Sequence, residues 1–213
     1  MIASPAPCRP SPLTLLAILA GNLIPIAGVL WFGWNAAQVL LLYWIETFIV
    51  GVVTYQRIRT AQGGTGHVNR DSHPAGRPEG FFVMHYGIFW LVHGVFVVIM
   101  LFMFGDVGGP GAVWRATFGN GGFWLAAAGM ALTHAVVFWR EWVRPRAWMT
   151  ADPEMELFRP YGRVFALHIV VVAGFWLLLK FGGGAVGLII LLCAAKALVE
   201  LVIEIIPKRP VRE

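Results

Sequence analysis

The sequence predicts an all-α membrane protein, a polytopic bundle of six transmembrane helices, and three observations lead to this prediction. The chain of 213 residues is 58% hydrophobic and only 13% charged, and its mean hydropathy is +0.72. A soluble domain usually carries about 25% charged residues. The charged residues gather in short segments, and the apolar runs between them are about 20 residues long, the length at which a helix crosses a bilayer.

Each apolar run is expected to form one helix. The first run follows Arg9 and continues to Trp31, which is too long for a cleaved signal peptide, so we expect it to be retained as a span. Pro25 lies inside this run and is expected to kink the helix, because proline lacks an N–H and clashes with the preceding turn. The expected spans are 13–33, 36–57, 81–104, 121–142, 161–181 and 184–206.

The spans form one transmembrane domain, 13–206, between an N-terminal tail, 1–12, and a basic C-terminal tail, 207–213. If the spans alternate in direction, thirteen Lys and Arg residues lie on the side of the termini, whereas Arg115 and Lys180 lie on the opposite side. Because basic loops stay in the cytoplasm, both termini are expected to be cytoplasmic.

Several function classes are not predicted. The net charge of +5 arises from residues that flank spans, so no nucleic-acid partner is expected. Two cysteines, Cys8 and Cys193, support neither a disulfide framework nor a thiolate zinc site. There is no Gly-rich phosphate loop. The loop at 143–160 is expected to lie along the lipid headgroups, with Trp142 and Trp148 as interfacial anchors.

Ionisable side chains inside the apolar runs indicate a functional site. Such a side chain at bilayer depth costs at least about 2.5 kcal/mol and usually marks a site. Counted from the cytoplasmic ends of the spans, these groups and one asparagine lie about 6 to 18 Å deep, at 1.5 Å per residue. They predict a polar cavity that opens toward the cytoplasm. The residues are Asn22, Glu46, His85, His93, His134, His168, Lys196 and Glu200.

Neutral imidazole binds zinc, iron or copper, and a carboxylate completes a mixed site, so we predict a transition-metal ion of unknown identity. Glu46 or Glu200 would be a carboxylate ligand or general base, and a metal-bound water would be the reactive species of a membrane-embedded enzyme. Lys196 and Asn22 are predicted to contribute to cofactor binding. A lipid or other apolar substrate could enter from the bilayer. The predicted metal ligands are His85, His93, His134 and His168.

Four alternatives stay open at this point. His134 and His168 have matched depths on neighbouring spans and could hold haem b. The histidines could instead form hydrogen bonds that join helices in a structural subunit. A transporter or proton relay also places Glu and His at depth. Lys196 and Glu200, four residues apart, could neutralise each other, or Lys196 could bind an anionic substrate.

A family resemblance rests on three elements of the sequence. These are Asn22 with Pro25, then Tyr43-Trp44-Ile45-Glu46, then His85-Tyr86-Gly87 with His93-Gly94 in the third span. The chain resembles, from about residue 14 to 206, a family of bacterial polytopic membrane proteins classed only as a domain of unknown function. The resemblance implies a multi-pass protein of the bacterial inner membrane and brings no activity, substrate or cofactor.

Overall fold

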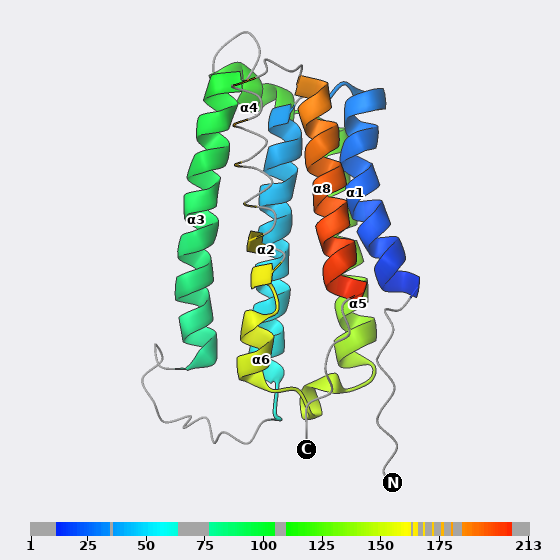
Figure 1. The fold of residues 1–213 in the computed structure, drawn as a ribbon, viewed down its shortest axis with the longest axis vertical. Helices are drawn as coiled ribbons and strands as arrows, with labels where there is room; N and C mark the ends of the chain where they lie inside the picture. The colour runs from blue at the N-terminus through cyan, green and yellow to red at the C-terminus, as the bar shows by residue number, and fades with distance from the viewer. Residues whose placement is uncertain are drawn as a thin grey trace.

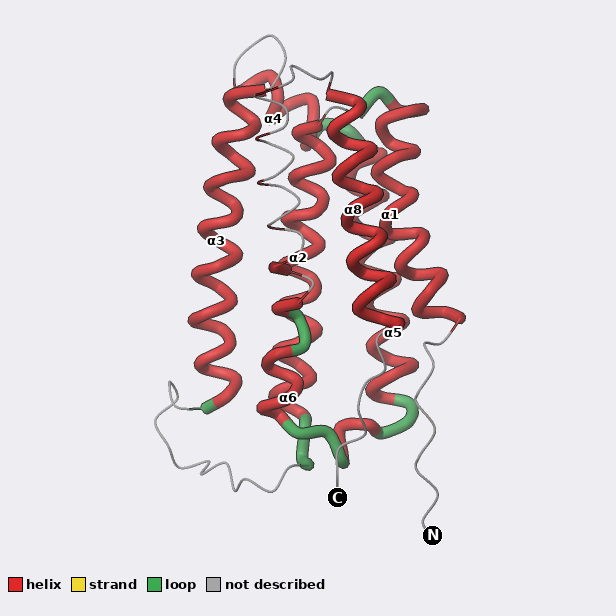
Figure 2. The backbone as a smooth tube through the Cα atoms, in the orientation of Figure 1, coloured by secondary structure: helices red, strands yellow, loops and turns green. Residues whose placement is uncertain are grey.

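The computed structural model describes residues 12–34, 36–63, 77–104, 110–162 and 185–205, together with 164, 165, 168, 172, 176 and 180. In these residues the chain is a bundle of long helices that run side by side (Figure 1), without any β-strand. Figure 2 shows that short loops and turns join the helices at the two ends of the bundle. The predicted all-α class is therefore confirmed.

Five long helices lie close to predicted spans. They are α1 (Pro12–Phe32), α2 (Ala36–Thr60), α3 (Pro78–Phe104), α5 (Gly121–Phe138) and α8 (Ala185–Ile205). Each bound lies within four residues of the expected one, because the same apolar runs define both. The expected span 161–181 and the tails, 1–12 and 207–213, lie mostly outside the described residues.

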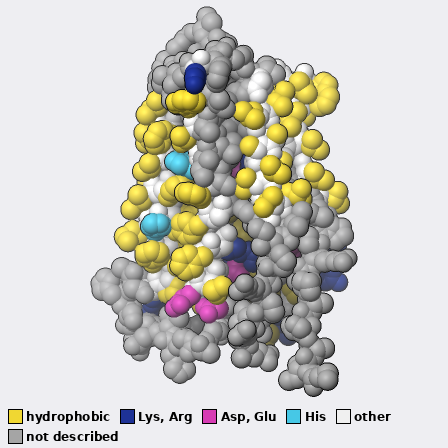
Figure 3. Space-filling view, viewed as in Figure 1, with side chains coloured by type: hydrophobic (Ala, Val, Ile, Leu, Met, Phe, Trp, Pro, Cys, Tyr) yellow, Lys and Arg dark blue, Asp and Glu magenta, His cyan; other side chains and the backbone are white. Residues whose placement is uncertain are grey.

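Among the described residues, three helices are long and apolar enough to cross a membrane: Gln38–Thr60, Pro78–Ile99 and Gly121–Val143. Large apolar side chains such as Ile88, Leu91 and Val95 of α3 are exposed, as expected for a surface that faces lipid. In the coloured part of Figure 3, hydrophobic side chains predominate, and most of the visible acidic and basic ones lie near one end. The count of six spans and their orientation stay predictions.

Local sequence explains where the helices begin and end. The Asn120 side chain accepts a hydrogen bond from the Gly122 N–H at 2.9 Å and caps α5. At its other end α5 continues as a π-helix, η2 (Trp139–Val143). Helix α1 ends before Gly33, whose φ of +64° is in the left-handed region that favours glycine.

Short helices fill segments outside the predicted spans. Helix α4 (Pro110–Phe118) precedes α5, and a 3₁₀-helix, η3 (Ala147–Met149), and α6 (Pro153–Phe158) follow η2. The expected role of Trp142 as an interfacial anchor is wrong. Its side chain is 2% exposed and its indole N–H donates to Thr60 Oγ1 at 2.9 Å, so it packs inside the protein. Trp148, in η3, is partly buried.

Helix α2 is the central helix, since it contacts α3, α5, α6 and α8. Two tryptophans join it to α3: the rings of Trp44 and Trp90 stack with centroids 4.3 Å apart. Each indole N–H donates to the other residue's carbonyl oxygen, at 3.0 and 3.1 Å. Gly94 allows this contact, because a Cβ added there would lie 2.8 Å from the Trp44 ring.

Substitution of Gly94 should therefore separate α2 from α3. We expect Gly94→Ala to lower the free energy of unfolding by about 1–3 kcal/mol, the usual cost of overpacking. Gly87→Ala, in the same helix, is a matched control because no atom lies within 4 Å of the added Cβ. Thermal unfolding in detergent measures both variants, and equal stability of the two would contradict the close packing at Gly94.

Candidate functional site

A buried cluster of three ionisable residues joins three helices. Glu46 lies on α2, Lys196 on α8 and His134 on α5. The Lys196 ammonium nitrogen lies 2.9 Å from Glu46 Oε2 and donates a hydrogen bond to Oε1 at 3.2 Å. On the other side, His134 Nε2 lies 3.5 Å from the same Oε1. One carboxylate is thus shared by an ammonium group and an imidazole.

Burial makes this arrangement necessary. The side chains of Glu46 and Lys196 are 7% and 5% exposed, and an unpaired charge at such a place would cost several kcal/mol. Pairing brings the net charge of Glu46 and Lys196 to zero within the bundle. His134, at 19% exposed, is the most accessible member of the cluster.

Tyr43 and Cys193 extend the cluster by one turn of each helix. The Lys196 ammonium nitrogen lies 5.0 Å from the centroid of the Tyr43 ring, a cation–π contact. The Tyr43 hydroxyl donates to Cys193 Sγ at 2.9 Å. Neither residue was among the predicted site residues. Tyr43 precedes Glu46 by three residues and Cys193 precedes Lys196 by three, so helical spacing from the charged pair could have indicated both.

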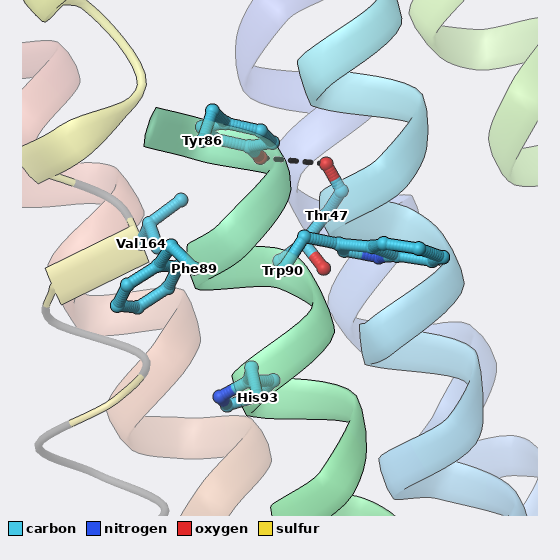
Figure 4. A pocket seen from close by; sticks show the side chains of 6 residues that line it. All are labelled: Thr47, Tyr86, Phe89, Trp90, His93 and Val164. Atoms are coloured by element: carbon cyan, nitrogen blue, oxygen red, sulfur yellow. Dashed lines mark hydrogen bonds between the residues drawn. The ribbon is translucent and has the colours of Figure 1, made fainter. Parts of the chain in front are cut away.

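A second pair of imidazoles lies elsewhere in the bundle. The Nδ1 atoms of His93, on α3, and His168 are 3.2 Å apart. His93 also lines a small, mostly apolar pocket with Thr47, Tyr86, Phe89, Trp90 and Val164 (Figure 4). Across this pocket the Tyr86 hydroxyl donates to the Thr47 carbonyl oxygen at 2.6 Å and joins α3 to α2.

His85 does not join either group. It is exposed on α3, where its ring stacks on Phe81 and lies 5.6 Å from the Tyr161 ring. In a helix with 3.6 residues per turn, His85 and His93 point in directions about 80° apart. This difference is enough for His93 to be buried while His85 faces outward.

Two predicted residues, Asn22 and Glu200, remain to be placed. Asn22 is buried on α1. Glu200 lies on α8, but its side chain is outside the part of the chain that the structure describes. Lys196 forms an ion pair between helices, because Glu46 of α2 lies within hydrogen-bond distance of its ammonium group.

The residues that the structure describes do not support the predicted four-histidine metal centre. They contain no group of three or more His, Cys, Asp or Glu side chains that could hold a metal ion. The histidines divide into the pair His93 and His168, His134 beside Glu46, and the separate His85. At Glu46, the Lys196 ammonium group already occupies the place where a cation would bind and would repel a divalent ion.

The two predicted haem ligands, His134 and His168, lie beside Glu46 and His93 respectively. Between His93 and His168, a separation of 3.2 Å leaves no room for a porphyrin with one imidazole on each face.

Comparison with known proteins gives one finding. A family model described as a family of unknown function (DUF6498) matches residues 5–213. No curated protein and no solved structure matches the chain.

Removal of the Lys196 charge alone should destabilise the protein more than removal of the Lys196 and Glu46 charges together. We expect Lys196→Met to lower the free energy of unfolding by about 3–5 kcal/mol, because Glu46 would be left buried and uncompensated. The double variant Glu46→Gln with Lys196→Met should recover most of that loss. Thermal unfolding in detergent tests this, and a double variant as unstable as Lys196→Met would contradict the pairing of the two charges.

Proposed function

The chain belongs to this family of unknown function, which the resemblance had predicted, and we propose that it is an integral membrane protein that binds and relays protons at its buried cluster. His134 is the group that gains and loses the proton. Glu46 stabilises the imidazolium, and Lys196 is the fixed positive charge. The relay serves proton transfer or proton-coupled transport of a substrate that remains to be identified.

The observation that carries the proposal is the sharing of one buried carboxylate by two basic groups on different helices. Chains of Glu and His at membrane depth are how proton pathways are built. Imidazole is the side chain whose unperturbed pKa, about 6.5, lies in the physiological range. The greater exposure of His134 supports proton entry from its side of the cluster.

Protonation of His134 would change the net charge of the cluster formed by Glu46, Lys196 and His134. With neutral His134, Glu46 and Lys196 neutralise each other. With charged His134, two cations compete for one carboxylate, which weakens the bond between α2 and α8. This competition couples a protonation event to the separation of two helices, as proton-driven conformational change requires.

The proposed topology has both termini in the cytoplasm of a bacterium and the chain in the inner membrane. Described arginines at one end of the bundle support this orientation, because basic residues flank spans on the cytoplasmic side. They include Arg57, Arg59, Arg140, Arg144 and Arg146. His134 precedes Val143, the last residue of its candidate span, by nine residues, or about 14 Å along a helix.

Proteoliposomes with a pH-sensitive dye inside test the proposal. After an imposed pH gradient, wild type should acidify the lumen, and His134→Asn and Glu46→Gln should reduce the rate at least about tenfold, or about 1.4 kcal/mol. Arg115→Gln changes an exposed residue of α4 and should retain the wild-type rate. Unchanged flux in both site variants would exclude the relay.

A second candidate function, transition-metal binding, is compatible with the His93–His168 separation. Two nitrogen ligands of one tetrahedral zinc ion, at bond lengths of about 2.0–2.1 Å, are about 3.3 Å apart. The observed 3.2 Å fits this value as well as it fits a hydrogen bond. A metal held there would need further ligands from water or substrate, since the two imidazoles supply only two.

Elemental analysis of the detergent-purified protein beside His168→Ala separates these two interpretations. Metal binding predicts a stoichiometric ion in wild type that is lost in the variant, whereas His134→Asn retains it because His134 is bonded to Glu46 instead. Negligible metal in all three proteins would leave a His–His hydrogen bond as the role of the pair.

A further inference from the structure

The end of α5 carries a basic row beside an apolar row. Helix η2 and the turn after it expose Arg140 and Arg144, four residues apart, and next to them Trp139 and Val143, with the same spacing. Residues four apart in a helix lie on one side, so each pair forms a short row along the axis.

Trp142 fixes the direction in which these rows point. Its indole N–H is bonded to Thr60 at the end of α2, and its ring lies 4.9 Å from the Arg57 guanidinium carbon. The π-helical turn is closed by a hydrogen bond from the Arg144 N–H to the Trp139 carbonyl oxygen at 2.8 Å. With Trp142 held inward, the two rows are presented outward.

Two acidic residues, Glu141 and Glu156, pair with Arg57 at 3.9 and 3.5 Å. Among the described residues, no carboxylate pairs with Arg140 or Arg144. Two uncompensated guanidinium groups therefore remain available for an anion at this surface.

The position of the rows indicates which anion. Val143 is the last residue of a candidate span, so the arginines lie where headgroup phosphates of the bilayer are found. Guanidinium groups bind phosphate with paired hydrogen bonds. A soluble anion would leave Trp139 and Val143 exposed to water, whereas a lipid places acyl chains against them and its phosphate against the arginines.

We propose that Arg140 and Arg144 form a binding site for the phosphate of an anionic phospholipid, with Trp139 and Val143 in contact with its acyl chains. Arg146, two residues after Arg144, is exposed too and has a left-handed φ of +57°. This conformation ends the helical path, so the chain turns back toward η3 and the site stays open to the bilayer.

Lipid retention by the full-length protein tests the site. Wild type is mixed in detergent with phosphatidylglycerol and phosphatidylcholine of identical acyl chains, and bound lipid is counted by native mass spectrometry. We expect wild type to retain phosphatidylglycerol in preference to phosphatidylcholine. The preference should disappear in the double variant Arg140→Gln with Arg144→Gln and persist in Arg115→Gln, which removes an exposed arginine of α4.

Two further measurements distinguish the source of the phosphate and the effect of folding. Inorganic phosphate at the same concentration should leave the thermal stability of the protein unchanged. Phosphatidylglycerol should raise the thermal stability of wild type but not that of the double variant. Without lipid, both should unfold at the same temperature, because the two arginines are exposed. An undiminished preference in the double variant, or stabilisation by inorganic phosphate, would overturn the proposal.

Discussion

The Glu46 carboxylate is the constraint on which the structure of this membrane protein depends. It lies on the central helix, where an isolated charge would be too costly to bury, and it is compensated by Lys196 of α8 and His134 of α5. The relative position of three helices is therefore fixed by one buried group. A change in the charge of either partner is a change in the forces between helices, which is how a protonation event could move the bundle.

Other contacts hold α2 against its neighbours without the Glu46 carboxylate. The stacked Trp44 and Trp90 hold α3 against one side of α2 without using any charge. At the far end, Arg57 and Trp142 hold the segment after α5. These contacts are made by Trp44 and Arg57 and do not involve Glu46. Helix α2 therefore keeps them if the ion pair between Glu46 and Lys196 weakens.

Much of the fold could be predicted from the sequence, because apolar run length determines where a helix can cross a bilayer. The site was predicted less well. Depth along a helix placed Glu46, His134 and Lys196 in one layer, and these three do meet. Depth does not give direction around the helix, so His85 was grouped with residues that it does not contact.

Partner choice was also beyond the sequence. The sequence suggested Glu200 or an anionic substrate as the partner of Lys196, and it did not indicate the pairing with Glu46, a residue 150 positions earlier in the chain. Spacing within one helix is visible in a sequence, but which helices lie side by side is decided by packing of the whole bundle. The inward position of Trp142 could not be predicted for the same reason. Trp142 lies at the end of an apolar run, but the π-helical turn directs its side chain onto Thr60.

The contact between Lys196 and Glu46 in a lipid bilayer is the most direct test of this account. Solid-state magnetic resonance can measure the dipolar coupling between ¹⁵N-labelled lysine Nζ and ¹³C-labelled glutamate Cδ in proteoliposomes, with Lys196→Met to assign the signal. The account predicts a strong coupling, since Nζ lies 2.9 Å from a Glu46 oxygen, and its loss in the variant. A wild-type spectrum without coupling beyond that of Lys196→Met would show that the charges do not meet and would contradict the account.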